Sequence, residues 1–527
     1  MIINCADTPD RTIFEADIVI IGAGAMGLAL TADLLDSGLS ILLLEAGGTQ
    51  ATPSNDDMLD VEIVGHPFYG ANMNGRRRIL GGATTLWGGQ FLELPDIVFE
   101  ERSWIAESGW PITKTELKPF YQRIATFAGL RQQEGSEDIW RCHGIKPPGY
   151  NRNLFISEFS RWSSKPDFGV NMYKILQDSH VVRVLLNASV TELRLDNHGS
   201  IKEVIIKSVN GFTATAKGRV FVLAAGAIES ARLLLASNNQ DKRGVGNRFG
   251  LVGRYFQDHT SLRVAKILPR DRSSFHELYE NFFIGATKYA PKITLAEYIQ
   301  RDEQLLNVGG FFHFPSDGHD GLSALKAIVG QLKRRRNPEK LLSSLKSSVT
   351  DIPEVMKFLY SLKVKNRIRA KRQGDIMLEI HAEQEPDYES CIRLSCKVDA
   401  LGMPLAQVDW RVSDRSRIAV LRYVESVQSE FNRLAIADVE LIPDLIDNAH
   451  SFQHHLRDVY HQMGTLRMSR DASAGVTNLD ARMHEVPNLY IAGCSLFPVS
   501  GYSNPTYTGL ALASRLADHL CVQLGAR

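Results

Sequence analysis

Apolar runs and helical patterns alternate at the start of the chain. The run 17–21, Asp-Ile-Val-Ile-Ile, is short and β-branched, which predicts a buried strand of a parallel sheet. A helical pattern follows over 28–37, and a second apolar run at 40–44 predicts the next strand. Strand, helix and strand in this order form the repeating unit of a doubly wound α/β sheet.

The turn between the first strand and the helix is rich in glycine. Gly22, Gly24 and Gly27 have the spacing of a dinucleotide-binding turn, and Glu45 follows the second strand, 18 residues after Gly27. In such a turn the first glycine permits the tight bend, the second lets the backbone approach a pyrophosphate, and the third lets helix and strand pack closely. The acid binds a ribose. The segment therefore predicts a bound dinucleotide at the helix N-terminus, without separating NAD from FAD.

Composition and charge narrow the classes of protein that remain. Of 527 residues, 44% are hydrophobic, so the chain can bury a core without disulfides or metals. Sixty Lys and Arg balance 60 Asp and Glu, which excludes a global attraction to nucleic acid. The six cysteines form no Cys-x-x-Cys pair, which argues against zinc ribbons and iron–sulfur clusters. With no secretion signal recognisable at the N-terminus, we expect free thiols and a cytoplasmic protein.

Further motifs follow along the chain. The segment 81–90 places two glycine pairs around Trp87, and 218–229 runs from an apolar strand through Ala225 and Gly226 into a helix. Small residues at these points let a large flat ligand approach the backbone. The C-terminal part contains His461-Gln-Met-Gly-Thr and, at 504–506, Asn-Pro-Thr, before a helical pattern over 507–520.

In this order the motifs resemble those of the glucose–methanol–choline (GMC) oxidoreductases, FAD enzymes that oxidise alcohols. The resemblance covers nearly the whole chain. The segment 109–121 is similar to the sugar-oxidising branch, the pyranose oxidases and sugar dehydrogenases. Flavin accepts a hydride from the alcohol carbon in such enzymes.

The resemblance implies an α/β fold in which a Rossmann-type FAD-binding domain is interleaved with a substrate-binding domain built on an antiparallel sheet plus helices. The FAD-binding domain would comprise 1–95, 185–260 and 450–527, and the substrate-binding domain 96–184 and 261–449. Expected strands of the second domain are Val308–Phe314, Ile376–Ala382 and Leu405–Trp410.

The resemblance also implies which residues hold FAD. The ADP half would lie against the N-terminal glycine turn and Glu45, and the flavin against the Gly-Gly segment and the start of the last helix. The implied cofactor-binding residues are Gly22, Gly24, Gly27, Glu45, Gly82, Trp87, Gly88, Val190, Ala225, Gly226, Gly493, Asn504, Pro505 and Thr506. Some family members link FAD covalently through a histidine at the position of Leu86, and leucine cannot form that bond, so FAD is expected to be non-covalent.

Alcohol oxidation requires a group that accepts the hydroxyl proton. His461 matches the catalytic histidine of the family, and imidazole suits this role because its ordinary pKa lies near neutrality. Asn504 matches the paired position; an amide is no base but can hold the substrate oxygen. We therefore expect His461 to be the base and Asn504 to orient the substrate. His259 is expected to be a structural residue near FAD.

Other candidate residues are less defined. His381 and Gln384, at the end of an alternating strand, are candidate substrate contacts, although a core histidine is as compatible with the pattern. His454, His455 and Asp458 precede His461, but this spacing matches no common ligand set, so no metal is expected.

The segment 333–372 is strongly basic. It holds 13 Lys and Arg against 3 Asp and Glu, a net charge of +10 in a neutral chain. A solvated helical face is the simpler interpretation, and docking to an anionic surface such as a membrane or an acidic electron acceptor is the alternative, which would make the protein peripheral to a membrane. Nucleic acid is not an expected partner.

The leading hypothesis is an FAD-dependent oxidoreductase that converts a secondary hydroxyl of a sugar, glycoside or cyclic polyol to a ketone, passing electrons to O2, a quinone or a protein. One alternative is a GMC enzyme for a non-sugar alcohol, and another is a flavin-binding subunit of a membrane complex without turnover. The His461 and Asn504 pair argues against the latter, because a scaffold has no need of it.

Overall fold

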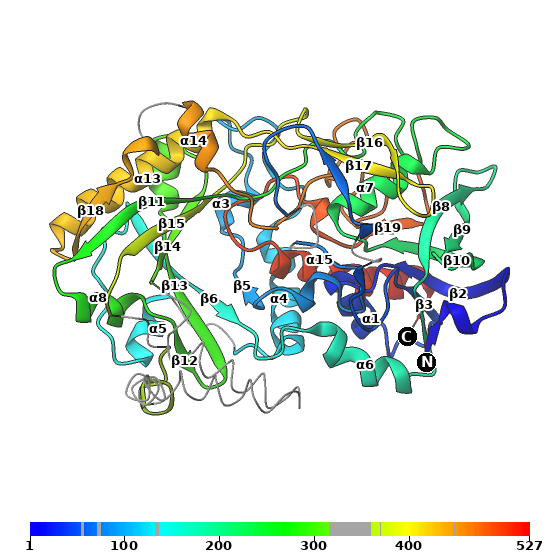
Figure 1. Ribbon diagram of the computed structural model, residues 1–527, viewed down its shortest axis with the longest axis horizontal. Coiled ribbons are helices and arrows are strands. Elements are labelled where there is room, and N and C mark those ends of the chain that lie inside the picture. Colours follow the sequence, from blue (N-terminus) through cyan, green and yellow to red (C-terminus); the bar gives the residue numbers. More distant parts are fainter. Residues whose placement is uncertain are drawn as a thin grey trace, which may run out of the picture.

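A computed structural model shows the mixed α/β architecture that the sequence predicts, with one parallel and one antiparallel sheet (Figure 1). The structure describes residues 1–53, 57–70, 75–131, 136–315, 360–368, 370, 372–445 and 449–526. Both termini lie beside the parallel sheet, and the C-terminal helix runs between this region and the antiparallel sheet (Figure 1).

The first sheet has a parallel core. The run predicted at 17–21 lies in a longer strand, and the one predicted at 40–44 is found at 41–44; the two pair in parallel, as in a doubly wound unit. An antiparallel meander extends one edge through the N-terminal half of the long strand β10. The strands, in sheet order, are β1 (Ile2–Asn4), β7 (Val182–Leu186), β3 (Ile41–Leu44), β2 (Thr12–Ile21), β10 (Thr213–Leu223), β9 (Ile201–Lys207) and β8 (Ser189–Leu195), with β19 (Leu489–Ile491) beside β10.

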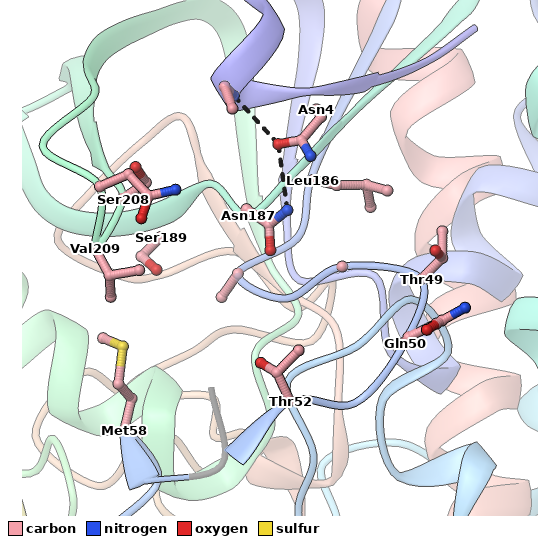
Figure 2. Close-up of a pocket in the computed structure, with 14 residues that line it drawn as sticks. Asn4, Thr49, Gln50, Thr52, Met58, Leu186, Asn187, Ser189, Ser208 and Val209 are labelled. Carbon is pink, nitrogen blue, oxygen red and sulfur yellow. Dashed lines mark hydrogen bonds between the residues drawn. The ribbon is translucent and has the colours of Figure 1, made fainter. Parts of the chain in front are cut away.

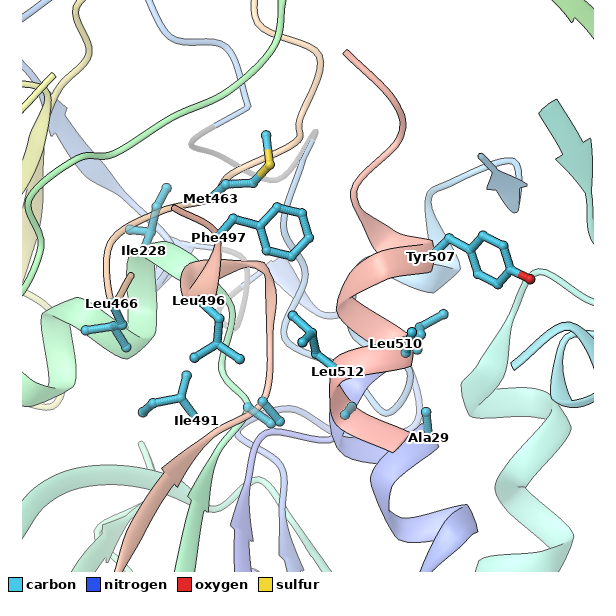
Figure 3. Close-up of a cluster of buried hydrophobic side chains, with 14 of the residues drawn as sticks. Ala29, Ile228, Met463, Leu466, Ile491, Leu496, Phe497, Tyr507, Leu510 and Leu512 are labelled. Atoms are coloured by element: carbon cyan, nitrogen blue, oxygen red, sulfur yellow. The ribbon is translucent and has the colours of Figure 1, made fainter. Parts of the chain in front are cut away.

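Three helices begin next to the carboxyl edge of this sheet. They are α1 (Ala25–Asp33), α7 (Ala227–Ala236) and α15 (Thr506–Leu524). Helix α15 is apolar around most of its circumference and is therefore buried; Figure 3 shows Leu510 and Leu512 on it, with Ala29 of α1 nearby. Gly509 permits this packing, because a Cβ there would lie 2.5 Å from Met26 Cε. The core thus fixes the start of α15.

The antiparallel sheet has one apolar and one polar face. Side chains alternate across a strand, so Ile380, Phe312 and their neighbours face helix α13 (Asp414–Arg433), where Phe312 and Phe431 have ring centroids 5.9 Å apart. The opposite face carries charged and polar side chains. In sheet order the strands are β18 (Ala437–Leu441), β11 (Thr260–Pro269), β15 (Ile376–Ala382), β14 (Val308–His313), β13 (Thr287–Leu295), β6 (Phe155–Trp162) and β5 (Gln90–Phe91), with β12 (Phe282–Ile284) beside β13.

One strand expectation was wrong in its placement. The run 405–410 forms a strand, β17 (Pro404–Asp409), but it pairs with β16 (Cys391–Val398) and, in parallel, with β4 (Val61–Ile63) in a separate three-stranded sheet. Its alternation predicted a strand but carried no information about the partner, which lies more than 340 residues away along the chain.

Shorter elements complete the fold. Helix α4 starts with a capping box, in which Thr113 accepts a hydrogen bond from the Glu116 N–H and the Glu116 carboxylate accepts one from the Thr113 N–H. The remaining elements are η1 (Cys5–Asp7), η2 (Gly82–Thr85), α3 (Asp96–Phe99), α4 (Lys114–Phe127), α5 (Ser136–Cys142), α6 (Phe168–Asp178), α8 (Arg272–Tyr279), α9 (Glu297–Asp302), η3 (Pro443–Leu445), α14 (Ala449–His455) and η4 (Cys494–Leu496).

The two sheets draw their strands from interleaved segments of the chain. The expected domain limits remain a proposed division, and two strands lie across them: β7 begins at 182 within the parallel sheet, and β5, at 90–91, pairs with β6 of the antiparallel sheet. Most of the basic segment, including 333–359, lies outside the described residues. In the parts that are described, no helix has the length and apolar content needed to cross a bilayer.

Candidate active site

A cavity of about 450 Å³ lies at the carboxyl edge of the parallel sheet. Strands β2, β3, β10 and β19 end there, and the residues that follow each of them line it. Open α/β sheets bind ligands at this edge. Of the residues predicted to bind a cofactor, those that line the cavity are Gly22, Gly24, Glu45, Gly82, Trp87, Val190, Ala225, Gly226, Gly493, Pro505 and Thr506.

The glycines of the turn divide into two kinds. A Cβ on Gly22 would lie 2.6 Å from the Ala224 carbonyl oxygen, and one on Gly27 would lie 2.0 Å from the Gly22 carbonyl oxygen. Packing within the protein therefore requires glycine at both positions. By contrast, a Cβ on Gly24 or Gly226 meets no described protein atom within 4 Å, so it would project into open space. That space is the cradle that a ligand lying against the backbone would fill.

Helix ends and a carboxylate complete this cradle. Gly24, Gly226 and Pro505 precede the first residues of α1, α7 and α15, so the positive ends of the helix dipoles meet the cavity, which suits an anionic ligand. Glu45 Oε2 accepts a hydrogen bond from the Ala23 N–H at 3.0 Å, and Oε1 accepts one from the Gly47 N–H at 2.8 Å. Each oxygen keeps a second lone pair for a ribose hydroxyl.

Two of the predicted cofactor residues act through packing rather than by lining the cavity. They are Gly27 and Gly88. A Cβ on Gly88 would lie 2.2 Å from Trp162 Cζ3, so its lack of a side chain admits that ring. Trp87 lines the cavity and is held by its indole N–H, which donates to the Pro166 carbonyl oxygen at 2.7 Å.

A group of arginines beside the cavity had no role assigned from the sequence. Arg76 and Arg232 both pair with Glu229, at 2.7 and 3.0 Å. Arg78 lines the cavity and donates to the Ser189 hydroxyl, and within the described residues it forms no ion pair. A guanidinium without a carboxylate partner suits a phosphate. The run of three arginines at 76–78, shortly before Gly81, was the available signal for this.

A second hollow adjoins the cavity at its sheet edge. Ala46 and Ser189 line both, so the two hollows meet beside the end of β3 and the start of β8. Figure 2 shows this hollow, where the side-chain amide of Asn187 donates to Asn4 Oδ1 at 3.2 Å. Its walls combine amides and hydroxyls with apolar side chains such as Met58, Leu186 and Val209, a mixture that would fit the adenosine end of a dinucleotide.

The predicted catalytic residues come together at the opposite end. His461 lines the cavity, and its Nε2 lies 3.3 Å from Asn504 Nδ2, although the two residues are 43 positions apart. Asn504 Oδ1 is buried and has no hydrogen-bond partner in the described structure. Asn504 is fixed because Pro505 and Thr506 begin the buried helix α15. The imidazole nitrogen of His461 and the amide nitrogen of Asn504 thus meet at this point, although Asn504, like Gly27 and Gly88, does not itself line the cavity.

Burial lowers the pKa of His461 well below its ordinary value, and the positive charge of the neighbouring Lys292 lowers it further. The imidazole is therefore neutral at physiological pH and can accept a proton. Burial also lowers the pKa of Lys292 to about 8, and Glu158 partly offsets this. The site thus contains a neutral base beside a cation that loses its charge in a moderately alkaline range.

His381 and Gln384, the two predicted substrate contacts, differ in their surroundings. The ring centroids of His381 and His461 lie 6.4 Å apart. The Nδ1 of His381 is buried and has no partner among the described residues. Gln384 is buried with its amide engaged by the protein: Oε1 accepts from Trp410 and from the Asp258 N–H, and Nε2 donates to backbone carbonyls. His381 thus has an unpartnered ring nitrogen, whereas the Gln384 amide already bonds to the protein; both stay predicted substrate contacts.

A row of polar side chains crosses the antiparallel sheet on the face that carries His381. Strand register places Glu158 of β6 opposite Lys292 of β13, and Phe311 of β14 opposite Glu379 of β15. Lys292 Nζ lies 5.2 Å from the centre of the Phe311 ring, and Tyr502 donates its hydroxyl proton to Glu158. This face therefore presents both signs of charge beside the catalytic pair. Within the described residues no cluster of three metal-binding side chains occurs.

Comparison with known proteins agrees with this geometry. Residues 17–246 match the family described as FAD dependent oxidoreductase, and 386–513 match GMC oxidoreductase. The fold is similar to that of pyridoxine 4-oxidase from Mesorbium loti, with a TM-score of 0.57 and 16% identity over 96% of this chain and 99% of that one. The cradle and these matches together define a flavoprotein, an FAD-dependent oxidoreductase that acts on CH–OH groups.

The GMC oxidoreductase match covers about a quarter of the chain, and curated relatives extend the similarity over nearly all of it. Paromamine 6'-oxidase from Streptomyces fradiae is 24% identical over 97% of this chain and 92% of its own, and the fructose dehydrogenase large subunit from Gluconobacter japonicus is 22% identical over 96% and 97%. Relatives named as choline and 2-methyl-1,2-propanediol dehydrogenases match at 22% as well, so the similarity selects no substrate class.

Proposed function

We propose that this enzyme oxidises a secondary hydroxyl of a sugar, glycoside or cyclic polyol to a ketone. The observation that carries the proposal is the polar sheet face beside the catalytic pair. Glu158, Lys292 and Glu379 alternate in charge along it, and His381 adds an unpartnered ring nitrogen. Carboxylates, an ammonium and an imidazole can form further hydrogen bonds with a substrate that has several hydroxyl groups, whereas an apolar aryl alcohol or a sterol would displace water from them without offering such bonds.

In the proposed reaction His461 Nε2 accepts the hydroxyl proton of the substrate. Asn504 holds the same oxygen by a hydrogen bond and so orients the adjacent carbon. FAD, when bound, supplies the acceptor for the hydride that leaves this carbon. The O–H and C–H bonds break, a C=O bond forms, the proton stays on His461 and the electron pair leaves with the hydride. His381 and the polar row would bind the other hydroxyls.

We further propose that FAD is held without a covalent link. Leu86 lines the cavity and carries no nucleophile. Gly24, Gly226 and Arg78 would hold the pyrophosphate, Glu45 the adenosine ribose, and the start of α15 the flavin. Acid or heat should release intact FAD into the supernatant of the denatured protein. Yellow colour that stays with the precipitated chain would contradict the proposal and indicate a linkage to another residue.

The substrate class is tested by an anaerobic screen of flavin bleaching. Glycosides and cyclic polyols are compared at equal concentration with an aryl alcohol and with choline, and reoxidation by O2 or a quinone is then followed. The proposal expects bleaching by at least one polyhydroxy compound and slower bleaching by the other two. Bleaching by the aryl alcohol or choline alone would overturn the substrate class, and no bleaching by any alcohol would favour a scaffold.

A further inference from the structure

We propose that His259 is a positioning residue that fixes the proton of His461 on Nδ1 and leaves the lone pair on Nε2, facing Asn504. This inference rests on the proposed role of His461 as the base. The sequence suggested only a structural role for His259, and the two histidines are 202 positions apart.

The assignment follows from a series of hydrogen bonds that begins at a backbone carbonyl, a group that can only accept. His259 Nε2 faces the carbonyl oxygen of Ser500 at 3.5 Å, and a carbonyl can only accept, so Nε2 carries the hydrogen. His259 Nδ1 is then unprotonated in the neutral ring. It lies 2.9 Å from His461 Nδ1, which must therefore be the donor. His461 Nε2 is left as the acceptor for the Asn504 amide, 3.3 Å away.

His259 stays neutral because it is deeply buried. Its exposed fraction is 0%, and burial lowers its pKa to about 3, with a small opposing effect from the Ser500 carbonyl. A neutral imidazole has one N–H, so it cannot donate at both nitrogens. His259 therefore donates at Nε2 and accepts at Nδ1 throughout the pH range in which the enzyme would work.

The same segment also holds the backbone of the catalytic turn. Asp258 Oδ2 accepts the His461 N–H at 2.8 Å, and Gln257 and Met463 exchange backbone hydrogen bonds at 3.0 and 2.8 Å. His461 is thus anchored at two points, its backbone N–H by Asp258 and its ring Nδ1 by His259. Asp458 adjoins Asp258, and the other titratable groups around the His461 ring are His381 on β15 and Lys292 on β13.

The arrangement determines where the proton goes. When Nε2 takes the proton of the substrate hydroxyl, the substrate O–H bond breaks and an Nε2–H bond forms. Nδ1 keeps its hydrogen and donates it to the lone pair of His259, which stabilises the imidazolium. Without His259, the other tautomer of His461 becomes accessible, and it would present an N–H where the base is needed.

Nitrogen chemical shifts of histidine-labelled holoenzyme test the tautomer without reference to activity. The His461 signals are assigned by their loss in His461→Gln. We expect the unprotonated type of shift for Nε2 and the protonated type for Nδ1. In His259→Leu the Nε2 signal of His461 should move towards the protonated type. In His381→Leu, a matched change of a histidine that takes no part in these hydrogen bonds, the same signal should not move. A protonated Nε2 in the parent would overturn the proposal.

Kinetics supply the second readout. His259→Leu removes the acceptor and should slow anaerobic flavin reduction about 10- to 10³-fold, with its acid limb shifted to lower pH. His259→Asn keeps an acceptor oxygen near the place of Nδ1 and should recover most of the rate. Equal rates and pH profiles in parent and His259→Leu would contradict the proposal. If His461→Ala also kept the parental rate, the base assignment itself would be the error, whatever the nitrogen shifts show.

Discussion

His461 and Asn504 have separate tasks in this account, because an imidazole can move a proton and an amide cannot. The His461 Nε2 and the Asn504 amide nitrogen lie 3.3 Å apart, so a substrate oxygen beside them can give its proton to the imidazole and accept a hydrogen bond from the amide. The consequences of losing each should therefore differ in size.

Asn504→Ala should reduce the rate of flavin reduction several-fold. It removes one hydrogen bond to an uncharged group, worth about 1 kcal/mol, with a larger effect if that bond tightens on a developing alkoxide. Stopped-flow reduction under anaerobic conditions measures it, with flavin content as the control for folding. A loss as large as that of His461→Ala would show that Asn504 does more than orient the substrate.

The sequence indicated the individual residues that lie in motifs, but not the distant residues that they contact. His461 and Asn504 were predictable because each lies in a short motif. The contact between His259 and His461 was not, since it joins positions 202 apart, and neither ring nitrogen is marked by its neighbours in sequence. The contacts of Gln384 were hidden for a related reason: it follows the strand that carries His381, and its neighbours in sequence do not indicate that its amide binds Trp410 and Asp258.

In the glycine turn, Gly27 is needed for folding and Gly24 for binding of the cofactor. Gly24→Val should leave the protein folded with reduced FAD content, because the new side chain enters the cavity. Gly27→Val should destabilise or unfold the protein, because its Cβ would overlap the Gly22 carbonyl oxygen at 2.0 Å. Thermal unfolding together with flavin absorbance distinguishes the two. Full FAD occupancy in Gly24→Val would place the cofactor elsewhere.

A buried ion pair ties the end of β15 to the loop after α3. Arg102 and Glu383 are fully buried and bond at 2.8 and 2.5 Å, and Glu383 also accepts the Asn307 N–H. Arg102→Leu leaves a buried carboxylate without its cation and should lower the free energy of unfolding by about 3–5 kcal/mol. Denaturant titration measures this.

The exposed pair of Arg301 and Glu100 is a matched control, because it is also bidentate but about 40% exposed on both sides. Arg301→Leu should cost about 0–1 kcal/mol. Similar losses for the two variants would contradict the role assigned to the buried pair.

Elements with a strong local pattern were predictable. The Rossmann strands and the C-terminal helix follow from apolar runs that need no partner to be recognised. The sheet that a strand joins is different, as β17 shows: alternation predicts a strand, but pairing depends on which distant segment reaches its edge. The polar row over the active site was hidden for the same reason, since it needs the register of β6, β13, β14 and β15 together.

For the whole molecule, interleaving explains why the site could be predicted only in part. The cavity combines residues from 21 to 506, so it exists only when segments distant in the sequence have come together. The basic segment differs from the cavity, because its charge is evident from a single stretch of sequence. Its docking role stays a prediction.

If 333–372 docks to an anionic surface, neutralising Arg334, Arg335 and Arg336 to glutamine should weaken binding to vesicles containing anionic lipid, most clearly at low salt. Turnover of a soluble substrate with a small artificial acceptor should hardly change. Neutralising Lys242, Arg243 and Arg248, which are exposed elsewhere, serves as the matched control. Equal vesicle binding by all three proteins would leave a solvated face as the only interpretation.

The central claim is that His461 is the base for an FAD-dependent alcohol oxidation, and single-turnover flavin reduction across pH tests it most directly. In the parent the base has a lowered pKa, so the rate should hold as pH falls through 6.5 and decline only at lower pH, where His461 becomes protonated. His461→Ala should bind FAD yet reduce it about 10²–10⁴-fold more slowly, with partial recovery as pH rises. Reduction at the parental rate in His461→Ala would contradict the account.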